Sequence, residues 1–153
     1  MRHGGTIDKY MGDCIMAFWN APLDQPDHAA RALATAIEFD AAMPDINRTI
    51  RASLPSDSTV PDIRIGVGLN SGECVVGNMG SKQRFDYSVL GDAVNVASRL
   101  EGLCKQYGVP IVIGETTASL SGASDLTEID SVQVRGKQEA LKIYTPAKFA
   151  PAA

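Results

Sequence analysis

The stretch Arg84-Phe-Asp-Tyr-Ser-Val-Leu-Gly-Asp-Ala-Val-Asn-Val-Ala-Ser-Arg-Leu-Glu101 changes its periodicity at Gly91-Asp92. Before the glycine, side chains alternate in the way that is typical of a strand. After it, apolar residues recur at helical spacing, and the side chain of Asp92 can cap the new helix. The apolar face consists of Ala93, Val96, Ala97, Leu100, Leu103, Cys104 and Tyr107. We therefore predict a strand that ends near Leu90 and a helix that Gly108 closes.

Two polar residues, Asn95 and Arg99, lie four positions apart on the opposite face of this helix. On an arbitrary amphipathic helix such a pair can simply be solvated. The surrounding run, Tyr87-Ser-Val-Leu-Gly-Asp-Ala-Val-Asn-Val-Ala-Ser-Arg99, resembles the signature of class III nucleotide cyclases. In that family the asparagine and the arginine contact the ribose and the phosphates of the substrate. The resemblance therefore implies that Asn95 and Arg99 are catalytic residues.

A hairpin is predicted near the start of the chain, where Gly12-Asp13 separates two strand-like runs, Thr6 to Met11 and Cys14 to Trp19. Gly-Asp is a favoured two-residue turn because glycine accepts a positive φ. In an isolated Gly-Asp turn, an aspartate at this position can serve only to form the turn, without any binding role. The segment Asp8-Lys-Tyr-Met-Gly-Asp-Cys-Ile-Met-Ala17 also resembles class III cyclases. The resemblance implies that Asp13 is a ligand for Mg²⁺ or Mn²⁺, a role that suits a hard oxygen donor.

The same resemblance assigns three further residues to the binding of substrate. Lys9 stands at the base-reading position, where a lysine can donate to a ring nitrogen of adenine and where guanylate cyclases carry glutamate, so ATP is favoured. Ser88 takes the second base-reading place, and its hydroxyl can either donate or accept. Arg135 replaces a family lysine that reaches the triphosphate. Without the resemblance, the segment around Arg135 reads as a solvated hairpin end.

Length and composition suit one ordinary globular domain. The chain has 153 residues, of which 44% are hydrophobic and 21% charged, and no stretch is apolar for long enough to cross a bilayer. Three cysteines without metal spacing and the absence of a secretory leader predict a reduced, cytoplasmic protein, although a parent protein can still be tethered to a membrane. A net charge of -4 without a basic run argues against nucleic acid as a partner.

Other elements follow from hydrophobic patterning and turn residues. A helix is expected from His28, with Asp27 as its cap, and Pro44 should stop or kink it near Met43. The remaining expectations are a hairpin of 63–69 with 74–77, a buried strand at 110–114, a short helical turn at 115–120, and closing strands at 126–134 and 141–144.

The resemblance covers nearly the whole chain, with a cyclase catalytic domain at 1–148 and a short tail at 149–153. It implies an α+β fold with a ferredoxin-like antiparallel sheet and helices on one face. It also implies a head-to-tail homodimer with active sites at the subunit interface. The family reaction converts ATP into 3′,5′-cyclic AMP and pyrophosphate.

One family feature is not found in the sequence. The first strand of class III cyclases carries a Phe-x-Asp segment whose aspartate binds both metals, and no residue before Gly4 supplies it. Asp8 lies within the lysine strand and is a poor substitute on spacing. We therefore expect a domain without its first strand and helices, with little activity as this chain alone. The alternatives are a non-catalytic homologue that dimerises or binds nucleotide and, third, a guanylate cyclase.

Overall fold

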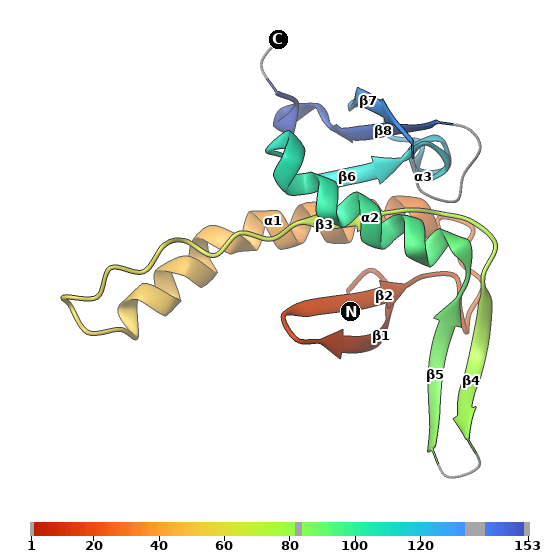
Figure 1. Cartoon of the computed structure of the whole chain (residues 1–153), viewed down its shortest axis with the longest axis horizontal. Coiled ribbons are helices and arrows are strands. Elements are labelled where there is room, and N and C mark those ends of the chain that lie inside the picture. The colour runs from red at the N-terminus through yellow and green to blue at the C-terminus, as the bar shows by residue number, and fades with distance from the viewer. Residues whose placement is uncertain (1, 82–83, 134–139, 152–153) are drawn as a thin grey trace.

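The computed structural model describes residues 2–81, 84–133 and 140–151 (Figure 1). The predicted phosphate-binding residue, Arg135, lies outside these residues. The elements, in chain order, are β1 (Thr6–Met11), β2 (Cys14–Phe18), α1 (His28–Ala52), β3 (Val67–Leu69), β4 (Val75–Ser81), β5 (Arg84–Leu90), α2 (Asp92–Tyr107), β6 (Ile111–Gly114), α3 (Glu115–Ser121), β7 (Leu126–Val132), β8 (Leu141–Pro146) and a 3-10 turn (Ala147–Phe149).

The core sheet has the strand order β3-β6-β8-β7, with β3 and β6 parallel and the other pairs antiparallel. The α+β class is confirmed, but the helices do not all lie on one face. Val112 and Ile143 pack with α2, whereas Ile111 and Ile113 point the other way and pack with α1 and α3. Because all four residues of β6 are buried, both faces of this strand need a cover.

Two hairpins stand apart from the core sheet as separate two-stranded sheets, β1-β2 and β4-β5 (Figure 1). The first is the predicted hairpin, with Gly12 at a φ of 64° in its turn. Phe18 on β2 lies against the second hairpin, with its ring centroid 6.0 Å from that of Tyr87 on β5. Within the described residues, no helix has the length and the apolar character needed to cross a membrane.

The predicted junction of a strand with a helix at the start of α2 is confirmed, but the predicted cap residue, Asp92, is wrong. Val96, Leu100 and Cys104 are buried, and Gly108 ends the helix in the left-handed region. The cap residue is Gly91, however, and Asp92 is already the first helical residue. An acidic residue there still interacts favourably with the positive end of the helix dipole.

Of the two outcomes expected at Pro44, a stop or a kink, the stop is excluded, since α1 contains Pro44 and continues to Ala52. The buried side chain of Asn47 explains how the part after the proline is held. Its Nδ2 donates to the Ile63 carbonyl oxygen and its Oδ1 accepts from the Ile63 amide, each at 2.9 Å.

At the N-terminal end of α1, Asp27 is the predicted cap residue, but its side chain makes no capping hydrogen bond. Its carboxylate accepts a hydrogen bond from Arg31 Nε instead.

The predicted hairpin of residues 63–69 with 74–77 is also wrong. Residues 63–66 are not in a strand, and β3 pairs with β6 in parallel, whereas β4 pairs with β5 over seven residue pairs. The chain leaves the core sheet after Leu69 and enters a separate ribbon. The strand at 110–114, the helical turn at 115–120 and the two closing strands are confirmed, although β7 ends at Val132 and residue 134 lies outside the described residues.

Gly68 lets β3 lie directly against the backbone of α2. A Cβ atom at this position would collide with the Ala97 carbonyl oxygen and the Glu101 amide nitrogen. We expect Gly68→Ala to lower the free energy of unfolding by about 3 kcal/mol, because helix and strand would have to separate. The matched control is Gly102→Ala on α2, where a Cβ meets nothing within 4 Å. That change should stabilise the helix by about 0.5–1 kcal/mol.

Urea unfolding followed by circular dichroism measures both variants. Equal midpoints for Gly68→Ala and the wild type would contradict the close packing of β3 on α2.

The buried thiol of Cys104 gives a second check on this packing. Burial raises the pKa of the Cys104 thiol to about 11, whereas Cys14 is exposed in β2. At about pH 8 only roughly 0.1% of such a thiol is the reactive thiolate, and access is blocked as well. A thiol reagent should therefore modify Cys14 quickly in the folded protein and Cys104 only after unfolding. Peptide mass spectrometry reads out both sites, and rapid native modification of Cys104 would contradict the packing.

Candidate active site

Strands β1 and β5 bring the two predicted base-reading residues together. Lys9 Nζ donates a 3.4 Å hydrogen bond to Ser88 Oγ, although the two residues lie 79 positions apart. Ser88 is almost fully buried, at 4% exposure, whereas the side chain of Lys9 is 45% exposed. The pair therefore presents a half-exposed cation beside a buried serine.

A third residue, Asp8, joins this pair, although the cyclase motifs in the sequence do not assign it to the base site. Ser88 Oγ donates to Asp8 Oδ2 at 2.8 Å, and the Val89 amide approaches the same oxygen at 3.4 Å. Lys9 Nζ lies 3.4 Å from the other oxygen, Oδ1. The side chain of Asp8 is only 1% exposed. We refer to Asp8, Lys9 and Ser88 as the base-site cluster.

A β-bulge explains how neighbouring residues of one strand reach the same hydroxyl. In a regular strand, Asp8 and Lys9 would point to opposite faces. In β1 the register shifts between Ile7, which pairs with Ala17, and Lys9, which pairs with Met16. The extra residue, Asp8, has no cross-strand partner in this register, and a bulge of this kind re-aims side chains. Sequence periodicity alone does not reveal such a shift.

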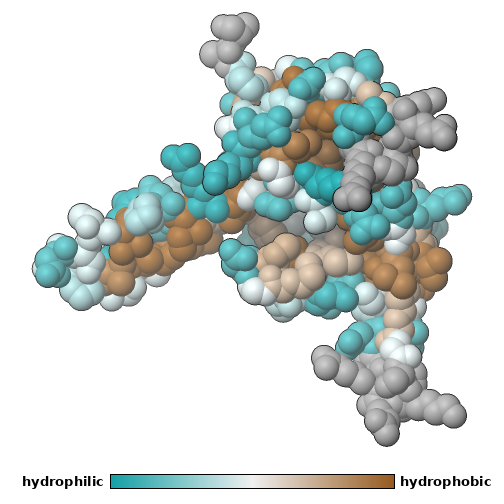
Figure 2. Space-filling view, viewed as in Figure 1, coloured by the Kyte–Doolittle hydropathy of each residue, from teal (hydrophilic) through white to brown (hydrophobic). Residues whose placement is uncertain are grey.

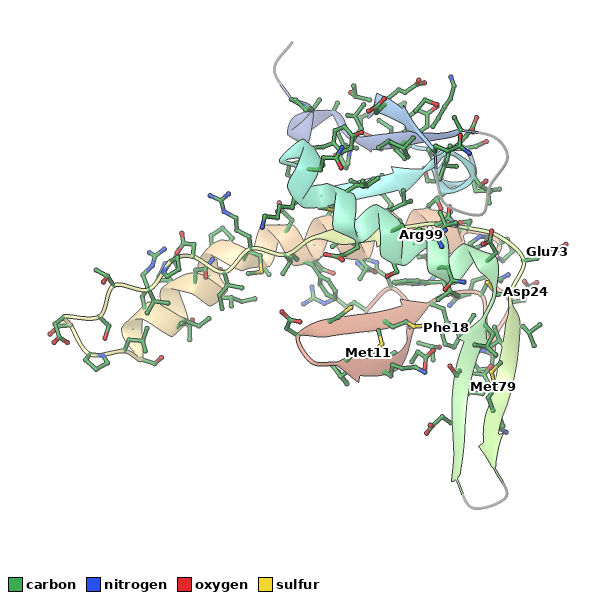
Figure 3. All side chains as sticks on the ribbon, in the orientation of Figure 1. Met11, Phe18, Asp24, Glu73, Met79 and Arg99 are labelled. Atoms are coloured by element: carbon green, nitrogen blue, oxygen red, sulfur yellow. The ribbon has the colours of Figure 1, made fainter. Side chains whose placement is uncertain are left out.

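The two predicted catalytic residues are carried by α2. Asn95 and Arg99 are both exposed and lie one helical turn apart, on the face turned away from the buried Val96 and Leu100. Figure 3 shows Arg99 on α2 above the β1-β2 hairpin. An exposed guanidinium next to an exposed amide can present several donors to a phosphate and a ribose.

The predicted metal ligand, Asp13, lies in the turn between β1 and β2, where it is exposed. Figure 1 shows this turn at the end of the hairpin that points away from the junction of β5 with α2. In the described part of the chain, no three His, Cys, Asp or Glu side chains gather in a way that could hold a metal ion. Mg²⁺ is commonly held by only one or two carboxylates together with substrate phosphates, and an exposed Asp13 fits that chemistry.

Comparisons with known proteins agree with the motifs. The sequence model described as "Adenylate and Guanylate cyclase catalytic domain" matches residues 5–145. "Adenylate cyclase 1" of Rhizobium meliloti is 36% identical over 143 residues, which are 93% of this chain and 21% of the relative. "Adenylate cyclase" of Anabaena cylindrica is 42% identical over 145 residues, which are 92% of this chain and 28% of the relative. The chain thus spans about a fifth to just over a quarter of these curated relatives.

Solved structures agree as well. The adenylyl cyclase CyaB from P. aeruginosa superposes with a TM-score of 0.81 at 34% identity, covering 94% of this chain and 71% of that one. The guanylyl cyclase Cya2 superposes with a TM-score of 0.78 at 34% identity, covering 94% and 70%. The family model matches most of the chain, and both an adenylyl and a guanylyl cyclase are similar to it. The chain belongs to the family of adenylate and guanylate cyclase catalytic domains.

Proposed function

We propose that this chain carries the ATP-cyclising domain of an adenylate cyclase, which forms 3′,5′-cyclic AMP and pyrophosphate. Curated relatives with that name are 36% and 42% identical over most of the chain. The observation that best supports ATP over GTP is the contact of Lys9 with Ser88. A lysine ammonium has only donors. Ring nitrogen 1 of adenine accepts a hydrogen bond, whereas the same nitrogen of guanine carries a hydrogen, so at this position Lys9 pairs with adenine.

The reaction is an in-line substitution at the α-phosphate. The ribose 3′-oxygen forms a bond to the α-phosphorus, while the bond from that phosphorus to the oxygen bridging to the β-phosphate breaks. Pyrophosphate leaves with that oxygen, and the proton of the 3′-hydroxyl passes to solvent. Such a reaction depends on positioning and on stabilising charge, without a covalent intermediate on the protein. Asn95 orients the ribose, and Arg99 donates to the charge that grows around the α-phosphate. Arg135 is proposed to hold the outer phosphates.

Asp13 is the residue proposed to hold the divalent cation that this family uses. When bound, the cation would lower the pKa of the 3′-hydroxyl and neutralise phosphate charge. The remaining roles belong to the side chains of the protein. The base-site cluster fixes the purine, and the exposed pair on α2 meets the reacting end of the nucleotide.

The site is proposed to form between two copies of the chain in a head-to-tail homodimer, since family members act as dimers. Asp13 lies in the β1-β2 turn and the catalytic pair lies on α2, in a different part of the fold (Figure 1). Large apolar side chains are exposed on both hairpins, namely Tyr10, Met11, Ile15, Val75 and Leu90. Figure 2 shows an apolar area over the upper part of the β4-β5 hairpin. Burying such side chains would favour association.

The test is cyclic nucleotide formation by the full-length gene product with Mn²⁺ and either ATP or GTP. The proposal predicts cyclic AMP from ATP, with a higher kcat/KM than for GTP. A higher kcat/KM for GTP would identify a guanylate cyclase. Nucleotide binding without turnover of either substrate would identify a non-catalytic homologue, and both of these outcomes would contradict the proposal.

A further inference from the structure

We propose that Asp8 is a positioning residue, which fixes the direction of the Ser88 hydroxyl hydrogen and thereby restricts the base site to adenine. The inference rests on the proposed function and adds a residue to it. A serine at a base-reading position is ambiguous by itself, because a hydroxyl can donate or accept. The surroundings of Ser88 remove this ambiguity.

The hydroxyl has a single hydrogen, and that hydrogen is already used. Ser88 Oγ donates it to Asp8 Oδ2 at 2.8 Å, and Ser88 is buried at 4% exposure. Any group that approaches Ser88 afterwards meets only the lone pairs of Oγ, one of which accepts from Lys9 Nζ. Towards a bound base, Ser88 is therefore an acceptor.

The groups at carbon 6 of adenine and guanine differ in whether they can donate a hydrogen bond to an acceptor. Adenine carries an amino group there, which donates, whereas guanine carries a carbonyl oxygen, which accepts. If Ser88 Oγ can only accept, it pairs with the amino group of adenine. With guanine, Ser88 Oγ would face the carbonyl oxygen at carbon 6, and neither oxygen could donate a hydrogen. The serine and the buried carboxylate together thus act as a hydrogen-bond acceptor for adenine, as a carboxylate in direct contact with the base would.

The position of Asp8 is held firmly enough for this role. The bulge in β1 turns the residue towards β5, and the Val89 amide approaches Oδ2 at 3.4 Å. The carboxylate is 1% exposed, so it cannot exchange its contacts for water without opening the strands. Its second oxygen, Oδ1, has no hydrogen bond, but Lys9 Nζ lies 3.4 Å away. The ammonium offsets the cost of burying the negative charge and is drawn towards the cluster.

The first experiment measures kcat/KM for ATP and for GTP with the full-length gene product and its variants Asp8→Asn, Ser88→Ala and the double variant. An asparagine amide can donate to Ser88 Oγ and release the hydroxyl hydrogen towards the base. Asp8→Asn should therefore lower the ratio of kcat/KM for ATP to that for GTP by about tenfold. In the Ser88→Ala background, the same change should leave the ratio unaltered, because no hydroxyl remains to be oriented.

The outcomes separate this inference from the proposed function. If the wild type cyclises no nucleotide, both fail. If the wild type cyclises ATP but Asp8→Asn lowers both kcat/KM values equally, with the same loss in the Ser88→Ala background, Asp8 is merely structural and the inference is overturned. An unchanged ratio in a folded Asp8→Asn protein overturns it as well.

A second measurement remains decisive if Asp8→Asn does not fold. Purine nucleoside triphosphate keeps the ring nitrogen of adenine and lacks the 6-amino group. The wild type should use it about tenfold less efficiently than ATP, and Ser88→Ala should lose this preference. Equal use of the two nucleotides by the wild type would show that Ser88 accepts nothing from the 6-amino group, which overturns the inference.

Discussion

Replacing Arg99 with alanine is expected to lower kcat for cyclic AMP formation by about 100-fold or more. The exposed guanidinium on α2 is proposed to donate to charge that develops only as the α-phosphate is attacked. Its loss should therefore affect kcat more than KM. Arg99→Lys keeps the charge and loses the planar pair of donors, so most of the deficit should remain.

The matched control is Lys105→Ala, which removes an exposed cation from the last turn of the same helix. Its kcat should stay within about twofold of the wild type, because a surface substitution away from a site has little effect. Initial rates with Mn²⁺ and saturating ATP measure all three variants. An Arg99→Ala enzyme with at least half of the wild-type kcat would contradict the assigned role.

Replacing Asp13 with alanine is expected to have an effect of similar size, for a different reason. Asp13 lies in the exposed turn after Gly12 and is the proposed carboxylate ligand of the catalytic cation. Loss of a cation that neutralises phosphate charge removes several kcal/mol of transition-state stabilisation, which is a loss of about 100-fold or more. The base-site cluster, with Asp8 and Lys9 on β1 and Ser88 on β5, is left intact.

A titration with Mn²⁺ distinguishes this role from a turn former. The Asp13→Ala protein should need a higher Mn²⁺ concentration for half-maximal activity, whereas Asp24→Ala, which removes an exposed acid from a loop, should not. Asp13→Asn retains a residue suited to the turn and should be as impaired as Asp13→Ala. A wild-type response to Mn²⁺ in both Asp13 variants would contradict the assignment.

Local patterns in the sequence were enough to predict the elements that carry the site. Gly91 marks the change from period two to helical period, and Gly12 supplies the positive φ of the hairpin turn. Strand pairing was harder, because it is decided by contacts distant in sequence. Residues 63–77 look like a hairpin, but Gly68 fits β3 against α2, and β6 then pairs with β3 in parallel. No spacing rule within that segment contains this information.

The site was predictable to the extent that its residues belong to motifs. Lys9 and Ser88 were assigned to one base site from two motifs, and the structure places them in contact. The sequence shows Asp8 only as a poor substitute, on spacing, for the missing metal ligand, and a regular strand would turn it to the face opposite Lys9. The bulge that brings it to Ser88 is a feature of strand pairing and has no local sequence signal.

We propose that each active site takes Asp13 from one chain and Asn95 and Arg99 from the other. The most direct test mixes two inactive full-length variants, Asp13→Ala and Arg99→Ala, and measures cyclic AMP formation from ATP. Each mixed dimer would contain one intact site, so an equal mixture should recover about a quarter of the wild-type activity, given free exchange of subunits. A mixture that exchanges subunits and stays as inactive as its components would show that Asp13 and Arg99 serve the same site within one chain, and the claim would be wrong.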